Sequence, residues 1–172
     1  GLHKPNDIGP SDIHFENGVI DLLAADESQA TELAKKCLSF TQGDVAHFEF
    51  SDQSSLRDII PSNRQQTYDV RKIAQILVDA DSFLELTAGF GKTILTAFAR
   101  IEGKAIGLIA SNCMSLGGAL DANGAIKVSR FFDICNVFNI PIVSLVDTPG
   151  FMVGPESEKQ GAVNHMTSLF VA

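Results

Sequence analysis

The chain has 172 residues, of which 45% are hydrophobic and 20% are charged, a composition typical of a globular protein with a buried core. Its formal net charge of −8 argues against a nucleic-acid-binding surface, because phosphate contacts need clustered Lys and Arg side chains. No apolar run reaches the roughly 20 residues of a membrane-spanning helix, and residues 1–10 lack the apolar core of an export signal. Three widely spaced cysteines, Cys37, Cys113 and Cys135, indicate a reducing compartment rather than a disulfide framework.

Residues 1–40 begin with a polar loop rich in Gly and Pro, and the pattern then predicts a short strand at residues 18–20. A helix follows, because Asp26 is a good N-cap and Gln29, three residues later, completes a capping-box-like pair. Apolar residues recur at helical spacing in this helix. They predict one buried stripe, formed by Ala30, Leu33, Ala34, Cys37 and Leu38.

Residues 41–67 are predicted to be a linker, because they are rich in polar, turn-forming residues, as in the runs TQGD, SDQSS and PSNRQQ. We expect a short strand at residues 45–50 and a short anchoring turn around Leu56, Ile59 and Ile60.

Beyond residue 67, predicted helices and strands alternate, which favours an α/β layer structure. The predicted elements are a helix that begins at Tyr68-Asp69, an extended segment at 83–86, strands at 93–101 and 104–111, a helix at 122–138, a strand at 142–146 and a last helix from 155 to 172. Glu102-Gly103 between two apolar runs is a hairpin signal. The continuous β-branched run at 142–146 is typical of a strand covered on both faces. The first helix is expected to bury Val70, Ile73, Ile76, Leu77 and Ala80, and the long helix Ile126, Phe131, Ile134, Cys135 and Phe138.

Two loops follow predicted strands, at residues 112–121 and 147–155, and ligands of open α/β sheets bind at such strand ends. In the first loop, Gly117 and Gly118 would let backbone N–H groups approach a ligand oxygen closely. The N-terminus of the next helix would add positive potential suited to an oxyanion. The alternative is a glycine turn that serves only tight packing of strand against helix.

The titratable residues form no obvious catalytic set. The four histidines are scattered without metal-binding spacing, so no metal site is predicted. Asp147, at the end of a buried strand, is either a catalytic carboxylate or an acceptor that shapes the turn at residues 148–150, and we expect the second role.

A nucleotide-binding switch domain is the alternative function. The run TAGFGKT at residues 87–93 and the run DTPG at 147–150 imitate the phosphate loop and the switch element of GTPases. A phosphate loop, however, needs a glycine five residues before Gly91, where this chain has Leu86. Gly91-Lys92 also precedes a predicted strand instead of opening a helix, and no guanine-reading Asn-Lys-x-Asp element occurs.

The run from Tyr68 to Ala172 resembles the biotin-side half of the carboxyltransferase family of biotin-dependent acyl-CoA carboxylases and the related glutaconyl-CoA decarboxylase. The resemblance rests on features that occur in the family's order: Tyr68-Asp69, Phe83-x-Glu85-Leu86, Gly89-Phe90, Phe98-Ala99-Arg100-Ile101, Arg130-Phe131, Phe138-Asn139-Ile140-Pro141 and Asp147-x-Pro149-Gly150-Phe151. Residues 1–40 are similar to the end of the family's acyl-CoA-side domain, 41–67 to its interdomain linker and 68–172 to the first part of its biotin-side domain.

This resemblance implies an incomplete crotonase-like (ClpP/crotonase) α/β spiral and carboxyl transfer between carboxybiotin and an acyl-CoA. Two oxyanion holes of backbone N–H groups would hold the thioester and ureido oxygens, and no metal would be needed. Gly117 and Gly118 become candidate backbone donors, and Pro149, Gly150 and Phe151 are expected to line the biotin-side cleft.

The implied partners are acyl-CoA, a biotin carboxyl carrier or biotin carboxylase component, and further copies of the chain. The expected location is the cytoplasm, or the mitochondrial matrix in a eukaryote. The family's other glycine-rich oxyanion segments have no counterpart in these residues, so we expect the isolated chain to be inactive. We also expect it to self-associate through apolar surface on helices 123–138 or 155–172. A non-catalytic crotonase-like scaffold is a further alternative.

We predict that neither Mg-GTP nor Mg-ATP binds specifically, because Leu86 replaces the glycine that a phosphate loop requires. Calorimetric titration of the chain with each nucleotide checks this. Micromolar affinity for either one would favour the switch domain over the carboxyltransferase.

Overall fold

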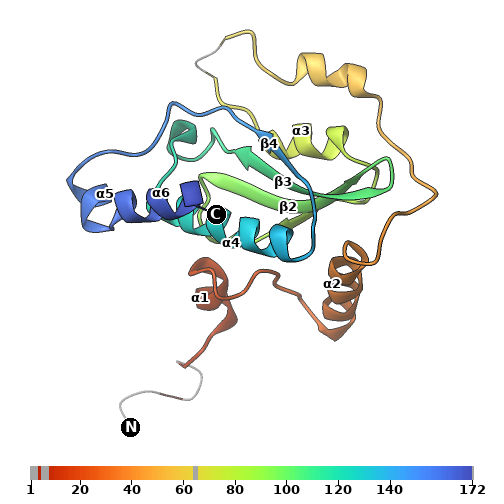
Figure 1. Ribbon diagram of the computed structural model, residues 1–172, viewed down its shortest axis with the longest axis horizontal. Helices are drawn as coiled ribbons and strands as arrows, with labels where there is room; N and C mark the ends of the chain where they lie inside the picture. Colours follow the sequence, from red (N-terminus) through yellow and green to blue (C-terminus); the bar gives the residue numbers. More distant parts are fainter. Residues whose placement is uncertain (1–3, 5–7, 64–65, 172) are drawn as a thin grey trace.

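The computed structural model describes residue 4, residues 8–63 and residues 66–171. Of the first ten residues, examined above for an export signal, residues 1–3 and 5–7 therefore lie outside the described range. At the centre is a four-stranded sheet in the order β1-β2-β3-β4 (Figure 1). Its strands are β1 (Leu84–Leu86), β2 (Ile94–Ile101), β3 (Lys104–Ser111) and β4 (Ile142–Leu145). The first three pair antiparallel, whereas β4 pairs parallel with β3.

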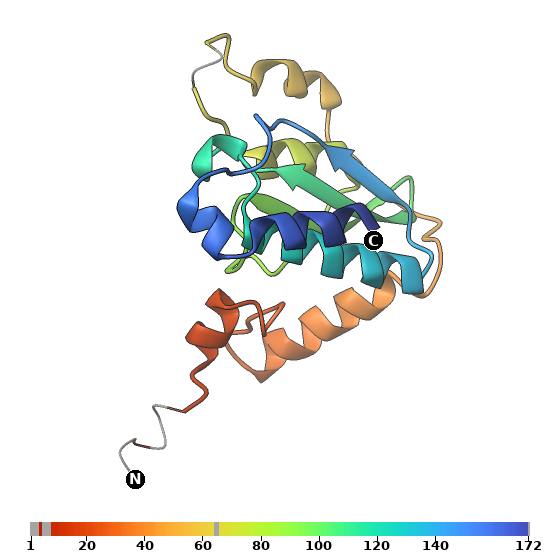
Figure 2. The same ribbon diagram turned by 60° about the vertical axis from the view of Figure 1, so that its left-hand side comes forward.

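Helices cover both faces of this sheet (Figures 1 and 2). Helix α3 (Val70–Leu77) packs on one face, and α4 (Ala122–Val137) packs on the other, beside α6 (Ala162–Val171). Residues of β2 alternate between the two cores, since successive side chains of a strand point to opposite faces. Leu95 and Ala97 join the core under α3, and Phe98 joins the core under α4. The predicted α/β layers and the extended segment at 83–86 are confirmed.

The β2–β3 turn is the predicted hairpin, and its backbone explains the Glu102-Gly103 pair. Both residues have positive φ, 51° and 76°, as a two-residue turn matched to the strand twist requires. The buried Asp79 carboxylate accepts hydrogen bonds from the N–H groups of Glu102 (2.9 Å) and Gly103 (2.7 Å). The turn is therefore stabilised by hydrogen bonds to Asp79, which follows α3, as well as by its own backbone conformation.

Buried Arg100 ties the linker to this hairpin. Its guanidinium donates to the carbonyl oxygens of Ser39 (2.6 Å), Gly43 (3.0 Å) and Gly103 (2.6 Å), and it stacks 5.4 Å from the centre of the Phe40 ring. A planar guanidinium can serve several acceptors at once. The start of the linker therefore has a defined position, although its residues are polar.

The N-terminal region agrees only in part with the sequence. Helix α2 (Glu27–Ser39) begins as predicted, because Asp26 accepts a hydrogen bond from the Gln29 N–H at 2.8 Å. Residues 18–20 form no strand, and a short helix, α1 (Ser11–Glu16), precedes them instead. The expected buried stripe of α2 is wrong. Ala30, Ala34 and Leu38 are exposed, and Leu33 and Cys37 are only half-buried. This face borders a groove of about 490 Å³ that extends to Phe98 and Ile134, so it is incompletely covered.

Three further expectations need correction. Residues 45–50 form no strand and contribute only the isolated bridge between Phe50 and Asp79. The expected turn near Leu56 is a 3-10 helix, η2 (Gln53–Asp58). The last helix is two helices, α5 (Pro155–Lys159) and α6, because Gly161 between them has a φ of +69°, which ends the first one.

Some residues expected in the core are not buried. Phe138 is 53% exposed because α4 ends at Val137, and Ala80 lies beyond the end of α3. Strand β4 is half-buried, not covered on both faces, since it lies at the edge of the sheet in the described part of the chain. In that part, no helix is both long enough and apolar enough to cross a membrane.

Lys127 is a buried cation that the apolar pattern of α4 did not predict. Its side chain is only 3% exposed, and its ammonium group donates to the carbonyl oxygens of Thr87 (3.0 Å), Phe90 (3.0 Å) and Ile94 (2.9 Å). It thus fastens the loop between β1 and β2 to α4. Burial lowers the pKa of Lys127 to about 8, although the nearby Glu85 carboxylate opposes this shift.

We predict that Lys127→Met lowers the free energy of unfolding by about 1–3 kcal/mol, because three buried carbonyls lose their charged donor. The deficit should grow as the pH rises from about 8 toward 10.5. In that window the unfolded wild type binds more protons than the folded one, so wild-type stability rises with pH, and the Met variant lacks this gain. Urea unfolding of both chains at several pH values measures the difference. A difference that shrinks with rising pH would contradict the assignment.

Candidate functional site

The parallel pairing of β4 with β3 brings two distant loops to one edge of the sheet. The paired residues run from Gly107 with Ile142 to Ala110 with Leu145, so both strands end on the same side. The loop at 112–121, which contains the short 3-10 helix η3 (Leu116–Gly118), and the loop at 147–155 therefore begin next to each other. This is the strand-end position predicted for a ligand site.

Backbone hydrogen bonds join the two loops. The Leu120 N–H donates to the Gly150 carbonyl at 2.9 Å, and the Met152 N–H donates to the Leu120 carbonyl at 2.8 Å. Leu120 and Phe151 thus form a parallel β-bridge. A displacement of one loop would strain the other.

A cleft of about 620 Å³ lies at this edge. Its lining comes from three separate segments, the linker, the loop after β3 and the loop after β4. The lining residues are Ile60, Pro61, Gln66, Thr67, Tyr68, Cys113, Gly117, Val146 and Asp147. The cleft therefore exists only because the linker returns to the sheet edge before α3 begins.

Tyr68 connects the three walls of the cleft. Its N–H donates to the Cys113 sulfur at 3.3 Å, and the Cys113 thiol donates to its carbonyl oxygen at 3.1 Å. Its hydroxyl donates to Oδ2 of Asp147 at 2.6 Å. Burial, together with the Asp147 carboxylate, raises the pKa of Tyr68 to about 12, so the hydroxyl keeps its proton at neutral pH.

Gly117 and Gly118 occupy different environments in the loop. The Gly118 N–H donates to the Ser115 carbonyl at 2.9 Å, and a Cβ on Gly118 would lie 2.8 Å from the Asp147 carbonyl oxygen. The Gly117 N–H makes no hydrogen bond within the described residues, and a Cβ there would meet nothing within 4 Å. Both residues have positive φ, 61° and 82°. Gly118 therefore has a packing role, whereas Gly117 has an amide available to a ligand.

The other predicted site residues lie beside the cleft and do not line it. Pro149 is exposed, Gly150 accepts the hydrogen bond from Leu120, and the Phe151 ring packs edge-on against Phe170 at 6.0 Å. Phe151 is 38% exposed. These residues support the loop that carries Asp147.

Asp147 does not shape the turn at residues 148–150 as expected. The Thr148 hydroxyl accepts the Gly150 N–H at 3.1 Å, while the Asp147 carboxylate pairs with Tyr68. Tyr68 and Cys113 line the cleft, although the sequence did not mark either of them as a cleft residue. Their signal was weak, since Tyr68 only precedes the N-cap Asp69, and Cys113 only follows a strand.

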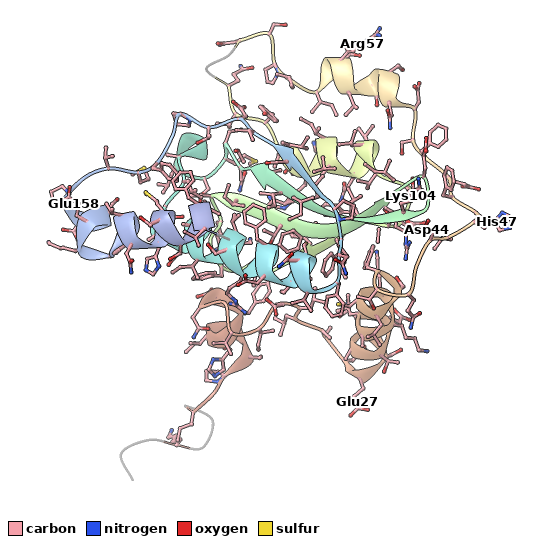
Figure 3. All side chains as sticks on the ribbon, in the orientation of Figure 1. Glu27, Asp44, His47, Arg57, Lys104 and Glu158 are labelled. Carbon is pink, nitrogen blue, oxygen red and sulfur yellow. The ribbon has the colours of Figure 1, made fainter. Side chains whose placement is uncertain are left out.

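Charged groups are sparse at the cleft. The side chains of Glu27, Asp44, His47, Arg57, Lys104 and Glu158 lie at the periphery of the molecule (Figure 3), and none of them lines the cleft. No three His, Cys, Asp or Glu side chains gather to hold a metal ion in the part of the chain that the structure describes. The polar groups among the lining residues are the Gly117 backbone amide, the Gln66 side-chain amide, the Thr67 and Tyr68 hydroxyls, the Cys113 thiol and the Asp147 carboxylate.

The phosphate-loop interpretation fails on geometry. Gly91 and Lys92 lead directly into β2 and not into a helix, so no helix N-terminus stands behind them. A Cβ on Gly91 would lie 2.8 Å from the Asn123 carbonyl oxygen, which shows that this glycine serves packing against α4.

Comparison with protein families and known proteins identifies the family. Residues 4–172 match the carboxyl transferase domain. The methylmalonyl-CoA carboxyltransferase 12S subunit of Propionibacterium freudenreichii subsp. shermanii is 35% identical, over 97% of this chain and 34% of its own length. The propionyl-CoA carboxylase beta chain of Saccharopolyspora erythraea is 34% identical, over 96% of this chain and 34% of its own length. The chain thus spans about a third of the length of these curated relatives.

Solved structures agree. A single-chain, multi-domain long-chain acyl-CoA carboxylase superposes with a TM-score of 0.97 at 43% identity, covering 99% of this chain and 17% of that one. The transcarboxylase 12S hexamer superposes with a TM-score of 0.86 at 35% identity, covering 96% of this chain and 34% of that one. The expected α/β crotonase-like fold is confirmed, and the chain holds a part of it. The chain belongs to the carboxyl transferase domain family.

Proposed function

We propose that this chain is part of a carboxyltransferase that moves a carboxyl group between carboxybiotin and an acyl-CoA. The observation that carries the proposal is the unpaired Gly117 amide, which lies in a strand-end cleft of a chain from the carboxyl transferase domain family. A backbone N–H positioned in advance stabilises developing negative charge on an oxygen without reorganisation during the reaction.

The cleft fits the ureido ring of biotin in its chemistry. Carboxybiotin, when bound, supplies the carboxyl group that is transferred. The Gly117 N–H would donate to the ureido oxygen, and Gly118, which has no side chain, lets the turn pack against the Asp147 carbonyl. Pro149, Gly150 and Phe151 would hold the second loop beside the ring. Tyr68, with its raised pKa, would keep its proton and act as a hydrogen-bond donor, not as a base.

The division of the chain follows from this proposal. Residues 1–40 would be the end of the acyl-CoA-side domain, 41–67 the interdomain linker, and 68–172 the first part of the biotin-side domain. The contacts of Arg100 with the Ser39 and Gly43 carbonyls support a boundary near residue 40, because they anchor the linker where α2 ends. The substrates would be acyl-CoA and a biotin carried on a partner domain or subunit.

Similarity to an oligomeric relative also leads us to propose that the chain assembles with further copies of itself. The related transcarboxylase 12S is described as a hexamer with methylmalonyl-CoA bound. Exposed apolar side chains on α6 and in the loop before α5, among them Val163 and Phe170 on α6 and Val153 in the loop, are consistent with contacts to further copies. A cytoplasmic location, or a mitochondrial one in a eukaryote, stays a prediction. The comparisons support neither the nucleotide-binding nor the scaffold alternative.

We predict that Gly117→Leu, made in a complete carboxyltransferase that contains this chain, lowers carboxyl transfer at least about tenfold, because a side chain there would enter the cleft and crowd the amide that stabilises the oxyanion. The measurement is transfer of a labelled carboxyl group from a carboxylated acyl-CoA to free biotin, which leaves the acyl-CoA as the second product.

Gly43→Leu is the matched control. Gly43 also has positive φ, 96°, and open space around its Cβ position, but it lies in the linker and does not line the cleft. It should suffer the same backbone strain, about 1–2 kcal/mol, without the loss of transfer. Equal losses in both variants would refute a role for Gly117, and a wild-type assembly that transfers no carboxyl group would refute the proposed function.

A further inference from the structure

The contact between Tyr68 and Asp147 joins parts of the cleft that are remote in sequence. Tyr68 stands at the end of the linker and Asp147 directly follows β4, yet the hydroxyl and the carboxylate oxygen are 2.6 Å apart. This length is typical of a hydrogen bond to a charged acceptor, which is roughly twice as strong as a neutral one. The contact therefore closes the cleft between the linker and the loop after β4.

The backbones of Tyr68 and Asp147 also make contacts with the loop after β3. Cys113 receives the Tyr68 N–H at 3.3 Å and donates to the Tyr68 carbonyl at 3.1 Å, so the tyrosine backbone is fixed to the loop after β3. The Asp147 carbonyl oxygen lies against Gly118, where a Cβ would come within 2.8 Å of it. The side chain of Asp147 faces Tyr68 while its carbonyl supports the glycine turn.

We infer that Tyr68 and Asp147 form a positioning pair, in which the tyrosine hydroxyl holds Asp147 so that the Asp147 carbonyl stays packed against Gly118 and the neighbouring Gly117 keeps its place in the lining of the cleft. The inference rests on the proposed carboxyl transfer function and adds two residues to it. Neither side chain needs to touch the reacting atoms.

The protonation of the pair fits positioning and not proton transfer. Burial and the adjacent carboxylate raise the pKa of Tyr68 to about 12, so its proton stays on the phenol oxygen over the working range of an enzyme. The Tyr68 hydroxyl therefore remains a hydrogen-bond donor from neutral to mildly basic solution.

Four variants of the assembled carboxyltransferase test the pair: Tyr68→Phe, Asp147→Ala, Asp147→Asn and the double variant Tyr68→Phe with Asp147→Ala. Tyr68→Phe deletes the donor alone, and Asp147→Ala deletes the acceptor. Asp147→Asn keeps an oxygen that accepts from the tyrosine hydroxyl. Asp133→Ala, on the exposed side of α4, is the control for loss of an aspartate away from the cleft.

The expected loss in kcat is about tenfold for Tyr68→Phe and for Asp147→Ala, the factor that corresponds to a hydrogen bond to a charged group. The double variant should lose no more than about twofold beyond either single one, because both deletions break the same contact. Asp147→Asn should keep most of the activity, and Asp133→Ala all of it. The KM for acyl-CoA should stay within about twofold, and the pH profile between roughly pH 6 and 9 should keep its shape.

The outcomes separate this inference from the function on which it rests. An active wild type with an unchanged Tyr68→Phe variant overturns the positioning pair alone. The positioning pair is also overturned if Asp147→Asn loses as much kcat as Asp147→Ala while Tyr68→Phe loses little. Those losses would assign the effect to the charge of Asp147. A wild type without transfer activity overturns the proposed function and the pair with it. If Asp147→Ala fails to assemble, Tyr68→Phe and Asp147→Asn still decide, since both keep the shape of the side chain.

Discussion

The parallel pairing of β4 with β3 is the constraint on which the candidate site depends. The other strand pairs are antiparallel, and an antiparallel partner would place the loop after β4 at the opposite end of the sheet. The parallel pair requires a crossover, and α4 supplies it by packing across one face. Once the pair forms, the loops at 112–121 and 147–155 share an edge and can bridge through Leu120 and Phe151.

Buried charged groups keep the surrounding loops in place. Lys127 donates to two carbonyls of the loop between β1 and β2 and to one at the start of β2, and Arg100 donates to one carbonyl each of α2, the linker and the hairpin turn. The acidic side chain of Asp79 holds the hairpin turn by accepting hydrogen bonds from two of its backbone N–H groups. Each group is buried with hydrogen-bond partners, which reduces the cost of burying it, although burial still disfavours the charged form of Lys127 and lowers its pKa to about 8. Loops with few apolar residues thereby acquire defined positions.

The chemistry of the cleft suits a carboxyltransferase that relies on backbone donors. Among the described residues the Gly117 N–H has no hydrogen-bond partner and Gly117 lines the cleft, while the Tyr68 hydroxyl donates to the Asp147 carboxylate and has a pKa raised to about 12. Glycine is needed at 117 and 118 for different reasons, one for access and the other for packing against Asp147. Under the proposed function, such a site would lose activity if its loops moved slightly. The hydrogen bonds of Tyr68 and Leu120 would then serve to hold the loops in position.

The sequence by itself determined most of the local structure, because local signals are carried by neighbouring residues. Asp26 capped its helix, Glu102-Gly103 formed the hairpin turn, and the family motifs from Tyr68 onward identified the carboxyltransferase fold. Gly117 and Gly118 were singled out from the sequence as candidate donors, and their different surroundings were visible only in the structure.

Only the tertiary structure decided which distant residues meet. The Tyr68–Asp147 contact, the burial of Lys127 beneath three carbonyls and the exposure of the apolar face of α2 leave no periodic trace in the sequence. A hydrogen bond between residues separated by 79 positions depends on the path of the whole sheet between them. Periodicity reports which face of an element is apolar, and it is the packing of other elements that determines whether that face is covered.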